Sequence, residues 1–301
     1  MRFVSLFITS FITLSHQTLA HSPGHGQHDY ELVKVTEVAG RQGVAVDSDH
    51  YYISGSLDLH KYDKDWNLLL SNTDPFSSLE KRANHLGDIA VHDGEIYTGI
   101  EWFEDGRGYD IQIAVYDAET LEYLRTFDWD EGSGQVEVSG LSVDTVNKLV
   151  LMTDWVEGNY VYRYSIDDGS YMGKVKLLPS PQWPQGITVY DGSIWFTADD
   201  GNADRKEFDN LWSIKATLEE GAEYIQHEHA FNATSDFLDY GEIEGLDFDE
   251  EAGELLVHHN RGKMVDKGKP TCLCPGCDHE VWEFCAHKVT QGNHLLNICQ
   301  N

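Results

Sequence analysis

The stretch EIEGLDFDEEAGELLVHHN, residues 242–260, joins a polar start, a glycine, a short apolar segment, an acidic turn and a second apolar run. The same arrangement recurs at RQGVAVDSDHYYISGS from residue 41, VSGLSVDTVNKLVLMTDW from 138 and PQGITVYDGSIWFTADD from 184. HLGDIAVHDGEIYTGIE, from residue 85, is a looser copy in which Asp88 takes the place of the glycine. Such self-similarity indicates that one supersecondary unit is built several times.

Each copy continues with further strand patterns, which gives about four short strands per unit at a period of roughly 45–60 residues. This pattern is typical of a β-propeller. We therefore expect an all-β fold, a propeller of five four-stranded antiparallel blades, with six blades as the alternative. The segment YELVKVTEV, residues 30–38, is expected to close the ring as the outer strand of the last blade. The propeller domain is expected over residues 30–289, followed by a C-terminal tail, 290–301.

The first twenty residues, MRFVSLFITSFITLSHQTLA, combine a basic start, an apolar stretch and small residues at the end. This is the pattern of a secretory signal peptide, residues 1–20, and its apolar part is too short to span a bilayer. A flexible, histidine-rich N-terminus, residues 21–29, is expected to follow. The sequence thus predicts a secreted, extracellular protein.

The charge is strongly one-sided, because 52 acidic side chains stand against 21 basic ones and give a net charge of -31. Such a charge argues against nucleic acid and anionic membrane surfaces as partners, and it favours cations and solubility. The expected partner is a small-molecule or glycan ligand. The sequence does not indicate an oligomeric state.

All cysteines lie near the C-terminal end, as Cys272, Cys274, Cys277, Cys285 and Cys299. Export favours disulfides, so we expect a local disulfide clamp whose pairing stays open and which leaves one thiol over. Zinc binding by the cysteines and neighbouring histidines is the alternative. Asn232, in Asn-Ala-Thr, is the expected glycosylation site.

In a propeller the first strand of each blade is innermost, and the second strand returns to the mouth at which the first began. Residues just before the repeat glycines and residues that end the second strands should therefore converge, and many of them are acidic. Converging carboxylates repel one another unless they bind a proton or a cation, and calcium takes six to eight oxygen ligands. The sequence predicts a divalent-cation site, with calcium as the ion, whose ligands are Glu244, Gln185, Asp88, Asp154 and Asp199. Hydrated acidic loop residues are the alternative.

The motifs E-G-L, Q-G-I and S-G-L before short inner strands resemble those of the SMP-30/gluconolactonase and paraoxonase-like propellers. In that superfamily, residues before such glycines hold a calcium ion that activates lactone or ester hydrolysis. The resemblance implies that Glu244 is a direct metal ligand, with Gln185, Ser139 and Gln42 beside it. The superfamily has six blades and asparagine ligands where this chain has Gln or Ser, and no position here matches its catalytic base.

A metal-dependent hydrolase of lactone or ester type needs a group that moves a proton, and imidazole titrates near neutral pH. His85 and His259 are the candidate catalytic histidines, and Asp88 is the candidate catalytic carboxylate. Neighbours in a strand point to opposite faces, so only one of His258 and His259 can face the channel. The candidate substrate-binding residues are Arg261, Glu101 and Trp155.

A non-catalytic extracellular propeller that binds a glycan or a protein is the alternative function, favoured by the supply of tryptophans and by the missing catalytic template. A calcium-stabilised structural protein is a third reading. The chain has no nucleophile elbow, P-loop, HExxH motif or Rossmann fingerprint. Covalent serine catalysis and nucleotide-cofactor chemistry are therefore not expected.

Overall fold

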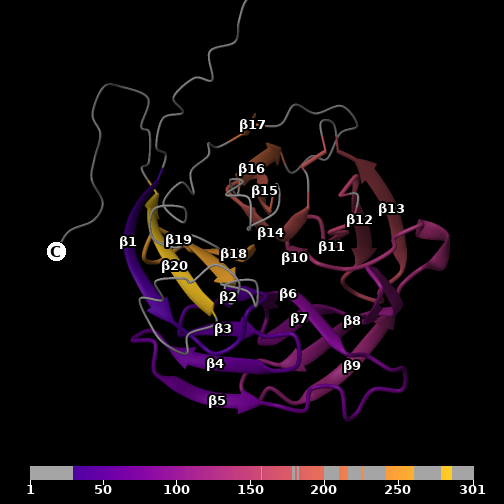
Figure 1. Ribbon diagram of the computed structural model, residues 1–301, viewed down its shortest axis with the longest axis horizontal. Coiled ribbons are helices and arrows are strands. Elements are labelled where there is room, and N and C mark those ends of the chain that lie inside the picture. Colours follow the sequence, from indigo (N-terminus) through magenta and orange to yellow (C-terminus); the bar gives the residue numbers. More distant parts are fainter. Residues whose placement is uncertain are drawn as a thin grey trace, which may run out of the picture.

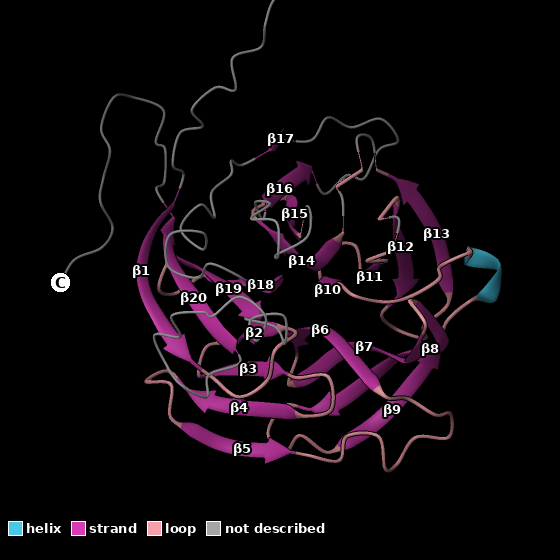
Figure 2. Ribbon diagram, viewed as in Figure 1, coloured by secondary structure: helices cyan, strands magenta, loops and turns pink. Residues whose placement is uncertain are grey.

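The computed structural model describes residues 30–156, 158–177, 180–181, 183–199, 210–215, 225–226, 242–260 and 279–286. For some strand residues in these segments it describes the backbone alone. In this part of the chain the helical structure is a single 3-10 turn, η1 (Glu131–Ser133), and no helix is long and apolar enough to cross a membrane. Strands make up most of the remaining described structure (Figure 2).

Strand pairing groups the described strands into five four-stranded antiparallel sheets. Four sheets each consist of consecutive strands: β2 (Val44–Val46), β3 (His50–Ser54), β4 (Leu59–Asp63) and β5 (Leu68–Asn72); β6 (His85–His92), β7 (Glu95–Glu104), β8 (Arg107–Asp117) and β9 (Tyr123–Asp128); β10 (Leu141–Asp144), β11 (Leu149–Thr153), β12 (Tyr160–Ser165) and β13 (Tyr171–Lys176); β14 (Pro184–Tyr190), β15 (Ser193–Ala198), β16 (Asn210–Lys215) and β17 (Ile225–Gln226). The remaining sheet joins β18 (Glu242–Asp249), β19 (Glu254–Asn260) and β20 (His279–Ala286) to β1 (Tyr30–Glu37).

The sheets are arranged around a central axis like the blades of a propeller (Figure 1). The innermost strands β2, β6, β10, β14 and β18 each contact the next one round, and β18 contacts β2. β1 pairs antiparallel with β20, so the N-terminal strand is the outer strand of the sheet that begins with β18, as the sequence predicted for residues 30–38. The prediction of an all-β propeller with four-stranded antiparallel blades is confirmed.

The apolar core lies between neighbouring sheets rather than within one of them. Tyr52 of β3 and Tyr116 of β8 belong to one buried cluster, and Leu151 of β11 and Phe196 of β15 belong to another. Each sheet has two apolar faces, and each face is removed from water by packing against a neighbouring sheet of the ring. This explains why the strand segments read as nearly continuous apolar runs.

The axis itself is filled by the side chain of Asp88. Its Oδ1 accepts a hydrogen bond from the backbone N–H of Ile89 at 2.9 Å, and its Oδ2 accepts one from Ile187 of β14 at 3.0 Å. Gly43 and Gly245 pass so close that a Cβ on either residue would meet Asp88 Oδ1. The chain has glycine at these two positions because the carboxyl group of Asp88, on β6, occupies the space that their side chains would need.

Hydroxyl groups on two of the second strands tie an inner strand to the next blade. Ser54 Oγ accepts a hydrogen bond from the backbone of its own inner strand and donates one to the Gly87 carbonyl of the following blade at 2.8 Å. Thr197 does the same between its own inner strand and the Glu244 carbonyl. We call these two side chains the hydroxyl bridges.

Candidate functional site

The upper mouth is the end of the ring at which the inner strands start. We call the residues at the glycine position of each repeat the axial residues: Gly43, Asp88, Gly140, Gly186 and Gly245. The mouth is built from the residues three positions before them and from their partners on the second strands. β6 pairs His85 with Glu101 and β18 pairs Glu242 with Asn260. In both strands the register shifts just beyond this pair, as it does in β14. Such bulges re-aim side chains and are frequent beside active sites. The five positions of this ring are Gly40, His85, Glu137, Trp183 and Glu242.

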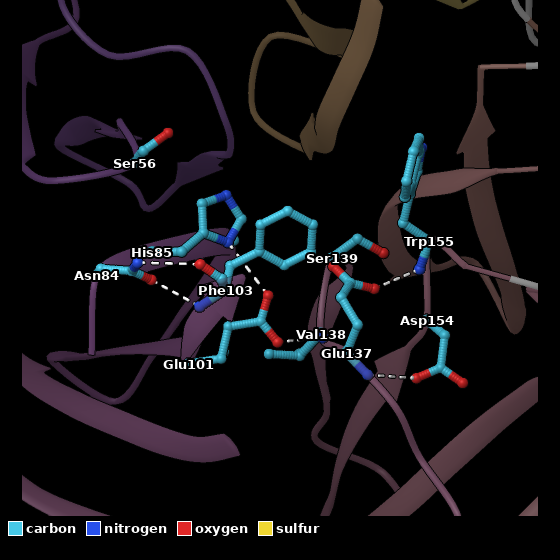
Figure 3. Close-up of polar contacts among 12 residues, drawn as sticks. Ser56, Asn84, His85, Glu101, Phe103, Glu137, Val138, Ser139, Asp154 and Trp155 are labelled. Atoms are coloured by element: carbon cyan, nitrogen blue, oxygen red, sulfur yellow. Dashed lines mark hydrogen bonds and ion pairs between the residues drawn. The ribbon is translucent and has the colours of Figure 1, made fainter. Parts of the chain in front are cut away.

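His85 and Glu101 form a fixed pair at this mouth (Figure 3). His85 Nδ1 lies 3.4 Å from Glu101 Oε1, and the imidazole keeps 21% of its surface exposed while the Glu101 side chain has none exposed. Glu101 Oε2 accepts a hydrogen bond from the Val138 backbone of the next blade at 3.0 Å. Gly108 leaves room for this carboxyl group, since a Cβ there would overlap Glu101 Oε2. Burial raises the pKa of Glu101, and His85 opposes that rise.

Asn84 holds the strand edge that carries His85. Its side-chain amide donates to the Phe103 carbonyl at 3.0 Å, and its oxygen accepts from the Phe103 N–H at 2.6 Å (Figure 3). The Phe103 ring lies 5.7 Å from the imidazole, centroid to centroid. The histidine is thus positioned from both sides, by a carboxylate and by an aromatic ring.

Glu137 and Asp154 stand on the next blade, beside Glu101. Glu137 Oε2 accepts a hydrogen bond from the Trp155 backbone at 2.5 Å. Burial, together with the negative charge of Glu101, holds the pKa of Glu137 well above its ordinary value. Burial also raises the pKa of Asp154 to about 6, against the hydrogen bond that the Tyr162 hydroxyl donates to it at 2.7 Å. Both carboxyl groups therefore keep their protons to a higher pH than an exposed carboxyl group does.

Glu244 belongs to a second group of acids at the mouth. Burial raises its pKa well above the usual range, and Glu242 and Asp199 add to that rise while Arg41 opposes it. Its side chain is also hydrogen-bonded with Asn260. The expected convergence of Glu244 with Asp199 is therefore present. Gln185 lies one residue before the axial Gly186, on β14.

Two of the predicted metal ligands have their oxygens in hydrogen bonds. Asp88 fills the axis below the mouth, as described above. Asp154 Oδ1 accepts from the Val136 and Glu137 backbones, and Oδ2 accepts from Tyr162. Across the described segments, no three His, Cys, Asp or Glu side chains form a group that could hold a metal ion. The calcium site stays a prediction.

Several predicted residues lie deeper in the fold or beyond the described segments. His258 and His259 are both buried on β19, at 0% and 1% exposure, so neither imidazole is open at the mouth, and a catalytic role for His259 stays a prediction. Arg261, Asn232 and four of the cysteines lie outside the described residues, and Cys285 is described through its backbone only, on β20.

The lower mouth, where the inner strands end, opens into a cavity of about 530 Å³. Acidic residues line this cavity, and three of them accept hydrogen bonds that stabilise the fold. Asp47 Oδ1 accepts from the His50 backbone at 2.7 Å, and Asp144 Oδ1 accepts from the Asn147 backbone at 3.0 Å. Asp247 bridges the inner strands by accepting from the Val46 backbone and from the Thr188 hydroxyl. These carboxylates cap turns and join blades.

Glu137 and Trp183 are among the mouth residues that the sequence interpretation did not assign to the site. Both precede an axial glycine by three positions, as His85 precedes Asp88 and Glu242 precedes Gly245. The same offset of three in every repeat was the signal that could have found them.

Comparison with protein-family models and with curated proteins finds no match. Among solved structures, an exo-β-1,3-galactanase from Clostridium thermocellum is similar, with a TM-score of 0.55 and 12% identity over 82% of this chain and 62% of that chain. A β-1,3-galactosidase of GH43 bound to galactodeoxynojirimycin has a TM-score of 0.52 and 13% identity over 83% and 93%. A PQQ-bound aldose sugar dehydrogenase from Streptomyces coelicolor has a TM-score of 0.47 and 13% identity over 85% and 97%. The likeness to the two structures with TM-scores above 0.5 shows the propeller fold, and at such identities it does not reach the superfamily that the sequence resembles.

Proposed function

We propose that this protein is an exported, five-bladed propeller hydrolase that cleaves an ester or lactone bond at the upper mouth. The observation that supports this most directly is the His85–Glu101 pair: a partly open imidazole whose Nδ1 faces a fully buried carboxyl group at 3.4 Å. A carboxylate in that position favours the tautomer with a proton on Nδ1, which leaves Nε2 free to accept a proton from water.

The proposed reaction needs one base and one acid. His85 Nε2 takes a proton from water as the water oxygen attacks the carbonyl carbon, and Glu137 in its protonated form gives its proton to the leaving alkoxide as the bond from carbon to that oxygen breaks. The imidazolium then returns its proton to Glu137, which restores both groups and releases a carboxylic acid and an alcohol. The raised pKa of Glu137 supports its role as the acid.

The test is hydrolysis of a panel of nitrophenyl esters and lactones by the wild type and by His85→Gln. We expect the substitution to lower kcat/KM by about 10²- to 10⁴-fold, the usual contribution of a general base. His50→Gln is a matched control, because His50 also faces an aspartate, Asp47, at 3.6 Å with similar exposure, but at the lower mouth. Equal activity of the two variants would remove the assignment of His85.

The proposal also includes a calcium ion bound by Glu244 and the polar side chains around it. The donor set fits a hard cation, since Glu244, Asp199 and Asn260 offer oxygens and a bound cation would offset the burial of the carboxyl groups. Calorimetric titration with calcium should show binding to the wild type and at least a tenfold weaker affinity for Glu244→Gln. An unchanged affinity in that variant would contradict the assignment, and a Gln42→Glu variant, which adds a carboxylate at the equivalent position, should not weaken binding.

A further inference from the structure

Two tryptophans form a paired surface at the upper mouth. The Trp155 and Trp183 ring centroids are 4.7 Å apart, with the rings tilted by 42°. Trp183 keeps 36% of its surface exposed, which makes it one of the exposed large apolar side chains of the described residues. We call this pair the tryptophan platform. Burying such a ring would stabilise the fold, so its exposure at a polar mouth needs an explanation.

The platform is held rigidly beside the acid group. The backbone N–H of Trp155 donates to Glu137 Oε2 at 2.5 Å, and the backbone carbonyl of Trp183 accepts from the backbone N–H of Asp199 at 3.0 Å. Trp183 has a φ of +55°, a left-handed conformation that is strained for a bulky residue. Strain of this kind persists where the surrounding structure fixes it, and it clusters at ligand sites. The backbone that carries the two rings is therefore fixed, and that of Trp155 is bonded directly to Glu137.

An exposed aromatic ring beside polar groups suits a pyranose ring, which offers an apolar C–H face and a rim of hydroxyl groups. The carboxyl groups of the mouth can bind hydroxyls in either protonation state, and those that are ionised repel anions. Arg41 is the basic side chain that lowers the pKa of Glu244. The other charged groups that act on that pKa, Glu242 and Asp199, are acidic and raise it. The arrangement thus favours neutral or amino sugars over uronic acids and sulfated sugars.

We infer that the tryptophan platform binds a neutral pyranose unit of the substrate and holds the bond to be cleaved against Glu137 and His85. This inference rests on the proposed hydrolase function, and it names the substrate class of that site as a carbohydrate. Trp183 is then the residue that determines specificity, and Trp155 positions both the sugar and Glu137.

The experiment measures binding of neutral tetrasaccharides of β-linked glucose, galactose and xylose, with tetragalacturonic acid as the anionic counterpart. It uses calorimetry and the His85→Gln variant, so that no sugar is consumed. We expect at least one neutral sugar to bind, the galacturonide to bind at least tenfold more weakly, and Trp183→Ala in the same background to weaken neutral-sugar binding at least tenfold. Trp183→Phe should restore most of it, which also guards against a folding defect in the alanine variant.

Trp66→Ala is the matched control, because Trp66 also has a positive φ, +65°, but stacks on Tyr51 away from the upper mouth. Equal affinities in the Trp66 and Trp183 variants, or no binding of any neutral sugar, would overturn the inference even if the wild type hydrolyses simple esters. Sugar binding that depends on Trp183, without hydrolysis of any ester or acylated sugar, would uphold the inference and overturn the proposed function instead.

Discussion

Asp154 shows how one buried residue links the candidate site to stability. Its folded-state pKa of about 6 lies above the value near 3.9 of an unfolded aspartate, because burial outweighs the hydrogen bonds it accepts. Its protonation therefore favours the folded state. That contribution is complete below about pH 4 and is lost as the pH rises through 6, for a total of about 3 kcal/mol. The burial of this one carboxyl group thus lowers stability at neutral pH.

We predict that Asp154→Asn removes this pH dependence. An asparagine oxygen can still accept from the Val136 and Glu137 backbones, and its amide can donate to the Tyr162 hydroxyl. Between pH 4 and 8 the unfolding free energy should fall by about 3 kcal/mol less in the variant than in the wild type, as urea denaturation measures. Asp105→Asn, at an exposed hairpin turn, should match the wild type. A variant whose pH profile stays parallel to the wild type would show that Asp154 titrates normally.

At the scale of the strand, the repeat pattern predicted which segments pair but not how far they run. The apolar pattern EIYTGI ends at Ile100 and the pattern IQIAVYD begins at Ile111, whereas β7 continues to Glu104 and β8 begins at Arg107. Asp105 and Gly106 both have positive φ and close this longer hairpin above the mouth. An Asp-Gly turn of that kind is a hairpin signal that the apolar pattern does not contain, because the added residues are polar or aromatic.

The hydroxyl bridges are the element-scale feature with the clearest energetic consequence. Thr197 Oγ1 accepts from Gly186 and donates to Glu244, in a position with no exposure. We predict that Thr197→Val, which keeps the shape, lowers the unfolding free energy by about 2–3 kcal/mol because two buried backbone groups lose their partner. Chemical denaturation measures it, with Thr126→Val on the outer strand β9 as a control of small effect. A loss below about 0.5 kcal/mol would mean that the bridge is replaced by other contacts.

For the whole ring, the sequence placed the inner strands correctly but did not show that Asp88 fills the axis. An aspartate in a series of glycines looks like a ligand when each strand is considered alone. Its side chain proves to be the filling of the axis, and this depends on how closely Gly43 and Gly245 approach once all inner strands meet. Closure of a ring is a property of every blade together, so no single repeat carries the information. The mouth residues at the offset of three, by contrast, were readable in principle.

This view of the axis makes Gly245 the residue on which closure depends. A Cβ at this position would lie 2.6 Å from the Gly43 Cα and would also overlap Asp88 Oδ1, and backbone atoms of a closed ring cannot move aside. We predict that Gly245→Ala prevents folding to a soluble ring, which expression yield and circular dichroism would measure. Gly94→Ala is the matched control: Gly94 has a φ of +76° with no atom near its Cβ position, so only strain of about 1 kcal/mol is expected. A folded Gly245→Ala protein would mean that the inner strands are farther apart than the axis contacts require, and the account of Asp88 as the axial filling would have to be abandoned.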